Sequence, residues 1–235
     1  MSALERVDYR HGDTPLTGWL ARPAGPARAA IVIYPTIANV NAHMERRAAM
    51  LADAGYLALI ADFYGVTEGD WQGLAKDLRA DTVHYRARLS AAVATLRERP
   101  EAAGLALGAI GYCMGGQAAL EVARDAQDLS VVTSFHGLLE TGKAAEPGAV
   151  RARILVCHGD ADPMAPREHV LAFWEEMDAA GANWHLHSYS GVKHGFTDPG
   201  SDARGLAAIA YDASADRQSW AAMCELFDEV FGSRS

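Results

Sequence analysis

The chain contains Gly111-Tyr112-Cys113-Met114-Gly115-Gly116 directly after the apolar run Leu105–Ile110. The Ala-rich segment that follows, Gln117–Ala126, predicts a helix. A buried strand, a Gly-x-nucleophile-x-Gly turn and a helix in this order are typical of a nucleophile elbow. The two glycines flanking the cysteine have a steric reason, because such a turn strains the backbone of the nucleophile and brings the residues around it close together. The alternative interpretation is an ordinary Gly-rich turn that buries a cysteine.

Length, charge and cysteine usage limit the class of protein. The chain has 235 residues, half of them apolar, which predicts one globular domain over residues 1–235. Its formal net charge of −9 argues against nucleic-acid and anionic-membrane partners. Three cysteines at uneven spacing fit a reducing compartment, and the stretch Met1–Arg6 shows no secretion signal. We therefore expect a cytoplasmic protein that is a monomer or a homodimer.

Apolar runs of strand length alternate with segments of helical pattern. This alternation predicts an α/β fold, in which a mostly parallel sheet has helices on both faces. Val7–Arg10 and Leu16–Arg22 predict a hairpin at one edge of the sheet. Further strands are expected at Ala29–Tyr34, Tyr56–Ala61, Leu129–Phe135, Ile154–His158 and Trp184–Tyr189. Residues 62–75 have the composition of a loop, and helices are expected at Ala42–Ala54, about Lys76–Arg99 and Pro166–Ala180. A final helix is expected within Ala203–Phe231, most clearly from Asp216 onward.

Two later loops supply the groups that a nucleophilic cysteine needs. In hydrolases with a nucleophile elbow, an acid and then a histidine follow the nucleophile, each after a strand of the sheet. His194 stands directly after one predicted strand, and Asp160 and Asp162 stand directly after another. Asp162 is favoured as the acid, because Asp160 occupies a position where a carboxylate often caps a turn. The sequence thus predicts Cys113, His194 and Asp162 as a catalytic triad.

The predicted chemistry is attack by a thiolate. An adjacent imidazole raises the ionised fraction of a thiol, and Asp162 would fix the tautomer of His194. The backbone N–H of Met114 and the N–H of Ile37, in the loop after Ala29–Tyr34, are the expected oxyanion donors. Removal of one such donor typically reduces turnover by about 10²–10³.

Four segments together resemble the dienelactone hydrolase family. They are GYCMGG at 111–116, HGDAD at 158–162, KHGF at 193–196 and GYLALIADFYG at 55–65. The resemblance implies a compact α/β-hydrolase fold without a large lid and a Cys-His-Asp triad acting on enol-lactones. It also implies that no cofactor is needed and that Cys113, Asp162 and His194 hold the catalytic roles.

Two positions depart from the lactonases of that family. A glutamate that holds the resting thiol neutral in those enzymes is replaced by Thr36, so we expect Cys113 to be activated constantly. An arginine that clamps the substrate carboxylate after the catalytic histidine is replaced by Thr197-Asp198, an anion in place of a cation. Dienelactone itself is therefore not expected as the substrate, and a neutral ester, lactone or thioester is favoured. Arg79, Arg86 and Arg88 are candidates for a second clamp, and the alternative interpretation of each, which is favoured, is an ordinary surface arginine.

The substrate pocket is sought among residues near the ends of the predicted strands and in the loops that follow them. The candidates are Thr36, Tyr64, Trp71, His84, Tyr85, Arg86, His136, Phe196 and Asp198. His185 and His187 share one face of a strand, but no third ligand accompanies them, so no metal is predicted. Tyr64, Trp71 and Tyr85 suit a flat or apolar substrate, although residues that pack helices together would have the same identities.

Three functional hypotheses follow, all with a small molecule as partner. The first is a cofactor-independent hydrolase that forms an acyl-cysteine. The second is an acyl transferase or cyclase with the same triad, which differs only in what reaches the acyl-thioester. The third is a non-catalytic binding protein. The presence of the complete triad and both elbow glycines argues against the third.

Overall fold

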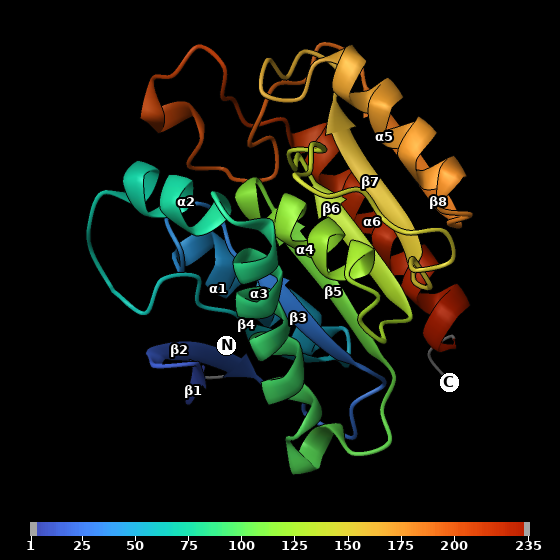
Figure 1. The fold of residues 1–235 in the computed structure, drawn as a ribbon. Helices are drawn as coiled ribbons and strands as arrows, with labels where there is room; N and C mark the ends of the chain where they lie inside the picture. The colour runs from blue at the N-terminus through green and yellow to red at the C-terminus, as the bar shows by residue number, and fades with distance from the viewer. Residues whose placement is uncertain (1–3, 233–235) are drawn as a thin grey trace.

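The computed structural model describes residues 4–232, in which one eight-stranded sheet is covered by helices on both faces (Figure 1). Across the sheet the strand order is β1-β2-β4-β3-β5-β6-β7-β8. The strands are β1 (Glu5–His11), β2 (Thr14–Ala21), β3 (Ala30–Tyr34), β4 (Leu57–Ile60), β5 (Leu107–Tyr112), β6 (Val131–Phe135), β7 (Arg153–Gly159) and β8 (Trp184–Tyr189). The helices are α1 (Ala42–Asp53), α2 (Trp71–Arg79), α3 (Thr82–Arg97), α4 (Met114–Arg124), α5 (Arg167–Ala179) and α6 (Ala213–Phe231). The predicted α/β-hydrolase fold is confirmed.

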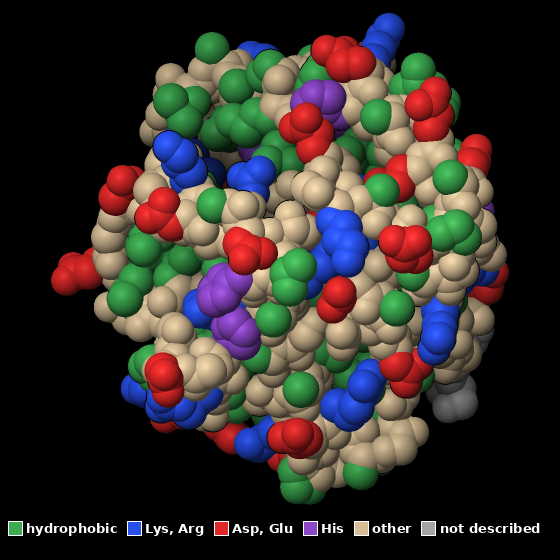
Figure 2. All heavy atoms as spheres, viewed as in Figure 1, with side chains coloured by type: hydrophobic (Ala, Val, Ile, Leu, Met, Phe, Trp, Pro, Cys, Tyr) green, Lys and Arg blue, Asp and Glu red, His purple; other side chains and the backbone are tan. Residues whose placement is uncertain are grey.

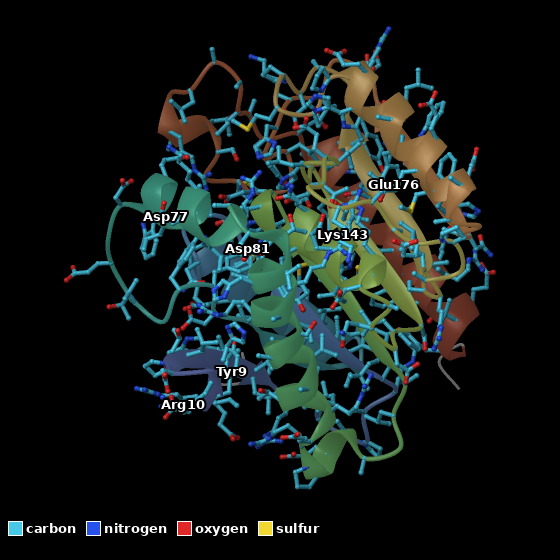
Figure 3. The ribbon with its side chains drawn as sticks, in the orientation of Figure 1. Tyr9, Arg10, Asp77, Asp81, Lys143 and Glu176 are labelled. Carbon is cyan, nitrogen blue, oxygen red and sulfur yellow. The ribbon has the colours of Figure 1, made fainter. Side chains whose placement is uncertain are left out.

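The N-terminal hairpin lies at one edge of the sheet, as predicted. β1 pairs antiparallel with β2, and β2 pairs antiparallel with β4, whereas β4, β3, β5, β6, β7 and β8 are mutually parallel. Tyr9 of β1, labelled in Figure 3, donates its hydroxyl to the carbonyl of Asp62 at 3.2 Å and accepts the Asp62 N–H at 2.9 Å. The hairpin therefore anchors the turn that follows β4. Residues 1–3, part of the stretch that shows no secretion signal, lie outside the described residues.

Each face of the sheet has its own hydrophobic core. Along β3, Ala30, Val32 and Tyr34 belong to the core under α3, α4 and α5, and Ile31 and Ile33 belong to the core under α1 and α6. This alternation follows from the period of two in a strand. Every residue of β3, β5 and β6 is buried, so the centre of the sheet is covered on both faces. Within the described residues, none of the helices has both the length and the apolar character required to cross a bilayer.

The single long helix expected over about Lys76–Arg99 is wrong. The chain instead forms α2 and α3, with a break at Asp81, whose carboxylate accepts the N–H groups of Val83 and His84 and caps α3. Asp81 is labelled at this junction in Figure 3. Asp70 caps α2 in the same way, so the loop expected over residues 62–75 ends earlier than predicted. An aspartate whose side chain binds free helical N–H groups begins a helix rather than continuing one.

The last helix lies within the segment Ala203–Phe231, as predicted. A short 3₁₀ turn, Asp202–Arg204, precedes α6. α6 begins at Ala213, where the Asp212 side chain accepts the N–H of Ala215. Residues 205–212, between these two elements, form a loop at the carboxyl edge of the sheet.

A buried network of charges connects α3, α4 and α5. Arg86 of α3 donates to Glu121 of α4 at 2.7 Å, and Arg124 of α4 donates to the same carboxylate at 2.9 Å. Arg124 also donates to Glu176 of α5 at 2.7 and 2.9 Å, and Glu176 is labelled in Figure 3. Buried charges are tolerated when they are paired and hydrogen-bonded, as they are here.

We expect Arg86→Met to reduce the free energy of unfolding by about 2–3 kcal/mol, because Glu121 stays buried with only Arg124 as its partner. The matched control is Arg6→Met. Arg6 pairs with Asp8 at 2.8 Å, but both side chains are more than half exposed. Loss of such an exposed pair changes the free energy of unfolding by less than about 1 kcal/mol. Urea denaturation measures both values, and similar losses in the two variants would contradict the expectation.

Candidate active site

Cys113 lies in a strained turn between β5 and α4. Its backbone has a φ of 59° and a ψ of −121°, a conformation that costs a side-chain-bearing residue about 1–3 kcal/mol. A Cβ on Gly111 would lie 1.8 Å from the carbonyl oxygen of Gly115, and a Cβ on Gly115 would lie 2.0 Å from that of Tyr34. Only glycine fits at these two positions. The turn has the form that the sequence predicts, and it places Cys113 at the N-terminus of α4.

His194 and Asp162 are in direct contact near this turn. The Nδ1 of His194 lies 2.7 Å from Oδ2 of Asp162, and both side chains are buried. The other carboxylate oxygen of Asp162 accepts the N–H of Met164 at 2.8 Å, which fixes the orientation of the carboxylate. Asp160 instead forms a two-pronged ion pair with Arg167 at the surface, at 2.8 and 2.7 Å. The structure thus brings Asp162, and not Asp160, to the histidine.

The thiol and the imidazole favour each other's charged forms. Burial raises the pKa of the Cys113 thiol, but the charge of His194 and hydrogen bonds from His194, Met114 N–H and Ile37 N–H outweigh it, so the pKa is lowered. Burial lowers the pKa of His194, but the charge of Cys113 and the hydrogen bonds with Asp162 and Cys113 raise it to about 10. These opposite shifts favour a thiolate–imidazolium pair at neutral pH.

The loop that carries Ile37 is held in place by Asp62. Asn39 has a φ of 59° and closes a turn by donating its N–H to the carbonyl of Thr36 at 2.9 Å. The Asn39 side chain donates to Oδ1 of Asp62 at 2.8 Å, and the same oxygen accepts the N–H of Tyr64 at 2.9 Å. A buried carboxylate therefore connects the loop after β3 to the turn after β4. This connection keeps the Ile37 N–H close to the thiol.

A cavity of about 250 Å³ lies beside Cys113 and His194. Of the predicted pocket residues, Thr36, His136 and Asp198 line it. Much of the apolar wall is formed by residues that were not predicted from the sequence, namely Leu138, Met164, Leu206 and Ile209. In Figure 2, hydrophobic side chains gather beside Lys and Arg side chains in the region between α2 and the loop after β8. The cavity is therefore largely apolar, with a cationic margin.

Two arginines line the cavity. Arg79, at the end of α2, is one of the three candidates for a clamp, and the structure places Arg79, not Arg86 or Arg88, in the cavity wall. Arg88 donates instead to the carbonyl of Phe63 at 2.9 Å. Arg204 is not among the predicted pocket residues. No periodic or motif signal marks it in the sequence.

Arg204 changes the expected role of Asp198. The guanidinium lies 2.5 Å from the Asp198 carboxylate, and both residues line the cavity. From the sequence, Asp198 is expected to be an isolated anion that repels a substrate carboxylate. The ion pair reduces that repulsion, because the opposite charges cancel at a distance. The prediction that Asp198 excludes anionic substrates by repulsion is therefore wrong.

The remaining predicted pocket residues near α2 and α3 do not line the cavity. Tyr64 lies behind the Ile37 loop and donates its hydroxyl to the Ile37 carbonyl at 3.1 Å. Trp71 packs on the Tyr64 ring, with 5.6 Å between centroids, and lines a neighbouring hollow of about 460 Å³ that includes neither Cys113 nor His194. Tyr85 is buried in the core under α3. These aromatic side chains support the site from behind.

Three other candidates have structural contacts instead. Arg86 is held in the buried ion pair with Glu121. His84 contacts the ring of His11, with 5.0 Å between centroids, and is exposed. Phe196 is buried against His136, with 5.2 Å between ring centroids. Within the described residues, no group of three or more His, Cys, Asp or Glu side chains is arranged to hold a metal ion.

Comparisons with known proteins agree with this fold. The sequence matches the dienelactone hydrolase family over residues 16–231. It is 30% identical over 216 residues to a probable 2-oxo-3-(5-oxofuran-2-ylidene)propanoate lactonase of a Bradyrhizobium species, covering 86% of this chain and 87% of the relative. It is 37% identical over 146 residues to an uncharacterised protein of Caenorhabditis elegans, covering 61% of this chain and 92% of the relative.

A solved structure is similar over nearly the whole chain. It is the dienelactone hydrolase-like promiscuous phosphotriesterase P91 from metagenomic libraries, with a TM-score of 0.91 and 33% identity, covering 97% of this chain and 98% of that one. The fold therefore defines an α/β-hydrolase. The chain belongs to the dienelactone hydrolase family and is a hydrolase that acts on lactone or ester bonds of a small-molecule substrate.

We expect iodoacetamide to alkylate Cys113 faster at neutral pH than an ordinary thiol. Because the pKa is lowered, the thiolate persists as the pH falls, and the rate drops only when the pH falls through that lowered pKa. His194→Ala removes the charge that lowers the pKa and should reduce the rate at neutral pH by about 10-fold or more, one pKa unit being a factor of ten. Intact-mass kinetics across pH measures the rate, with Cys113→Ala to identify the site. Equal rates in the wild type and His194→Ala would contradict the expectation.

Proposed function

We propose that this protein is a cofactor-independent hydrolase that cleaves an ester, lactone or thioester through an acyl-cysteine. Cys113 is the nucleophile, His194 is the general acid and base, and Asp162 orients the imidazole. The observation that carries the proposal is the 2.7 Å contact between His194 and Asp162 beside a thiol whose pKa is lowered. The same arrangement of nucleophile, base and acid performs acyl transfer on unrelated folds.

The first half of the reaction forms the acyl-enzyme. The Cys113 thiolate attacks the carbonyl carbon of the substrate, and the carbonyl π electrons move to oxygen. The N–H groups of Met114 and Ile37, which also lower the pKa of the Cys113 thiol, stabilise the oxyanion. The C–O or C–S bond to the leaving group breaks as the oxyanion collapses, and the His194 imidazolium donates its proton to the leaving group. The products are a thioester on Cys113 and an alcohol or thiol.

The second half hydrolyses the thioester. His194, now neutral, accepts a proton from water, and the hydroxide attacks the acyl carbon. The same two N–H groups stabilise the second oxyanion, and its collapse releases a carboxylic acid and restores the Cys113 thiolate. His194 ends the cycle as the imidazolium. Asp162 stabilises that charge in both halves through its bond to Nδ1.

Thr36 supports activation that does not wait for substrate. Its hydroxyl accepts a hydrogen bond from the Asn41 side chain at 3.1 Å and lines the cavity beside Cys113. A hydroxyl is not ionised at neutral pH, so it does not compete with the Cys113 thiolate for His194 as a carboxylate would. We therefore propose that the thiolate–imidazolium pair is the resting state of the enzyme.

The lining of the cavity supports small substrates without a net charge. Leu138, Met164, Leu206 and Ile209 offer apolar contacts, and Asp198 is neutralised by Arg204. The apolar contacts support neutral esters, lactones and thioesters as substrates, whereas the paired Asp198 no longer argues against an anionic lactone such as dienelactone. The similarity to a promiscuous phosphotriesterase adds neutral phosphotriesters as a class to assay. The absence of a disulfide among the three cysteines supports a reducing compartment, which we propose is the cytoplasm.

We expect Cys113→Ala to abolish turnover of a neutral aryl ester while the fold is retained, because both elbow glycines remain. Asp162→Asn should reduce kcat by about 10²–10⁴, since an amide does not stabilise the imidazolium. Asp160→Asn is the matched control and should change kcat by less than about threefold, because its ion pair lies at the surface. Initial rates together with intact-mass detection of the acyl-enzyme measure these effects.

Two results would overturn the proposal. One is a Cys113→Ala variant that keeps half of the wild-type rate, and the other is a larger loss in Asp160→Asn than in Asp162→Asn. Product analysis with and without an added amine or thiol separates hydrolysis from acyl transfer. A product that carries the added nucleophile in preference to water would assign the chain to the acyl transferases.

A further inference from the structure

His136 lies at the end of β6, directly behind the nucleophile. Its side chain is 1% exposed, and its φ of 40° is unusual for a residue with a side chain. Its backbone N–H donates to the carbonyl of Cys157 on β7 at 2.8 Å, which holds the backbone that carries the ring in place. The imidazole then lies between Cys113 and Thr197. None of the reaction steps proposed above uses it.

The two ring nitrogens of His136 have different partners. The backbone N–H of Cys113 lies 3.1 Å from Nδ1, and the hydroxyl of Thr197 lies 2.8 Å from Nε2. A backbone N–H only donates, so Nδ1 must be the unprotonated acceptor. The proton of the neutral ring is therefore on Nε2, which donates to the hydroxyl oxygen of Thr197. The nucleophile's own backbone selects this tautomer.

The hydrogen bonds beyond Thr197 are consistent with a proton on Nε2 of His136. The Thr197 hydroxyl lies 3.4 Å from Nε2 of His43, and Nε of Arg47 donates to the same nitrogen at 3.2 Å. Since a guanidinium only donates, Nε2 of His43 is an acceptor, and it therefore also accepts the hydrogen bond from the Thr197 hydroxyl. Arg47 is itself held by an ion pair with Asp216. A buried ion pair on α1 and α6 thus supports the orientation of the His136 ring.

His136 stays neutral beside a charged neighbour. Its ring centroid lies 5.1 Å from that of His194. Burial lowers the pKa of His136 well below its ordinary value, and the nearby charges of His194, His43 and Arg47 lower it further. Protonation would place a second donor against the Cys113 N–H and a like charge beside the His194 imidazolium. The arrangement is compatible only with a neutral His136.

We propose that His136 is a positioning residue that holds the Cys113 backbone N–H through Nδ1 and so keeps the strained nucleophile aligned with His194. The N–H of Cys113 also donates to the carbonyl of Phe135 at 3.1 Å, so two acceptors at the end of β6 fix one amide. A residue with a positive φ persists only when its surroundings determine it in this way. The inference rests on the proposed role of Cys113 as nucleophile.

Three variants separate positioning from simple packing. His136→Phe removes both hydrogen bonds and should reduce kcat by about 10- to 100-fold with KM changed less than about threefold, because a misaligned nucleophile affects the chemical step. His136→Asn keeps an acceptor near the position of Nδ1 and should recover most of kcat. Thr197→Val keeps Nδ1 but removes the hydroxyl that fixes the tautomer. In that variant we expect a partial loss of kcat, because the ring is no longer held in the tautomer that accepts the Cys113 N–H.

The wild-type enzyme provides a test that does not depend on a variant folding. In ¹⁵N-labelled protein, the two ring nitrogens of His136 are assigned by long-range ¹H–¹⁵N correlation, with His136→Asn to identify the signal. We expect a neutral ring with the proton on Nε2 across the pH range in which the enzyme is folded. A proton on Nδ1, or a doubly protonated ring at neutral pH, would overturn the inference.

The outcomes distinguish this inference from the proposed function. If folded His136→Phe keeps the wild-type kcat and the wild-type pH profile of Cys113 alkylation, His136 has only a packing role and the inference fails. If the Cys113→Ala variant retains turnover, the proposed function fails, whatever the tautomer of His136. A lowered kcat with an unchanged KM, together with rescue by asparagine, supports both.

Discussion

The backbone contact between Gly111 and Gly115 is the constraint on which the site depends. Because the two backbones lie closer than any Cβ would allow, the chain turns from β5 into α4 within a few residues and forces Cys113 to a positive φ. The thiol therefore lies at the N-terminus of a helix, where the N–H of Met114 reaches it. A partial positive charge at that position favours the thiolate. One steric fact thus determines the place of the nucleophile and contributes to its ionisation, which depends chiefly on His194.

The neighbouring strands supply the rest of the site from one edge of the sheet. Asp162 follows β7, His194 follows β8, and the loop after β3 carries Ile37. Side chains at the carboxyl ends of adjacent parallel strands lie at the same edge of the sheet, so short loops are enough to bring them together. Asp162 is fixed by the Met164 N–H, and the Ile37 loop is fixed by Asp62. The functional groups are therefore aligned by buried contacts on adjacent loops.

The sequence predicts the groups whose backbone conformation is demanding and misses those that only line a cavity. Cys113 and His194 stand in short motifs at strand ends, so their place in the fold follows from the order of elements. Leu206 and Arg204 lie in a loop with neither a periodic pattern nor a motif, and their approach to the site depends on tertiary contacts. Asp198 could be found, but its partner could not, because an ion pair across a loop leaves no spacing signal.

Helix boundaries and helix faces show the same limit. The break between α2 and α3 depends on the Asp81 side chain capping a helix, which a continuous helical pattern conceals. Once the break shifts the phase of α3, Tyr85 and Arg86 point into the core and the buried ion network rather than into the cavity. Residue type alone did not distinguish an aromatic side chain that supports a site from one that touches substrate. His136 shows the converse, since a residue predicted only as pocket lining has specific polar contacts.

The loop between β8 and α6 is fastened at its base by His194 itself. The N–H of His194 donates to the carbonyl of Ala208 at 3.1 Å, and the N–H of Ala210 donates back to the carbonyl of His194 at 3.1 Å. The backbone of the histidine is thus secured independently of the distal residues of the loop, among them Arg204 and Leu206. Mutations there can alter the shape and charge of the entrance without displacing the imidazole. Because the backbone of His194 is held separately from the residues at the entrance, substitutions at the entrance can change substrate preference while the reaction centre stays the same.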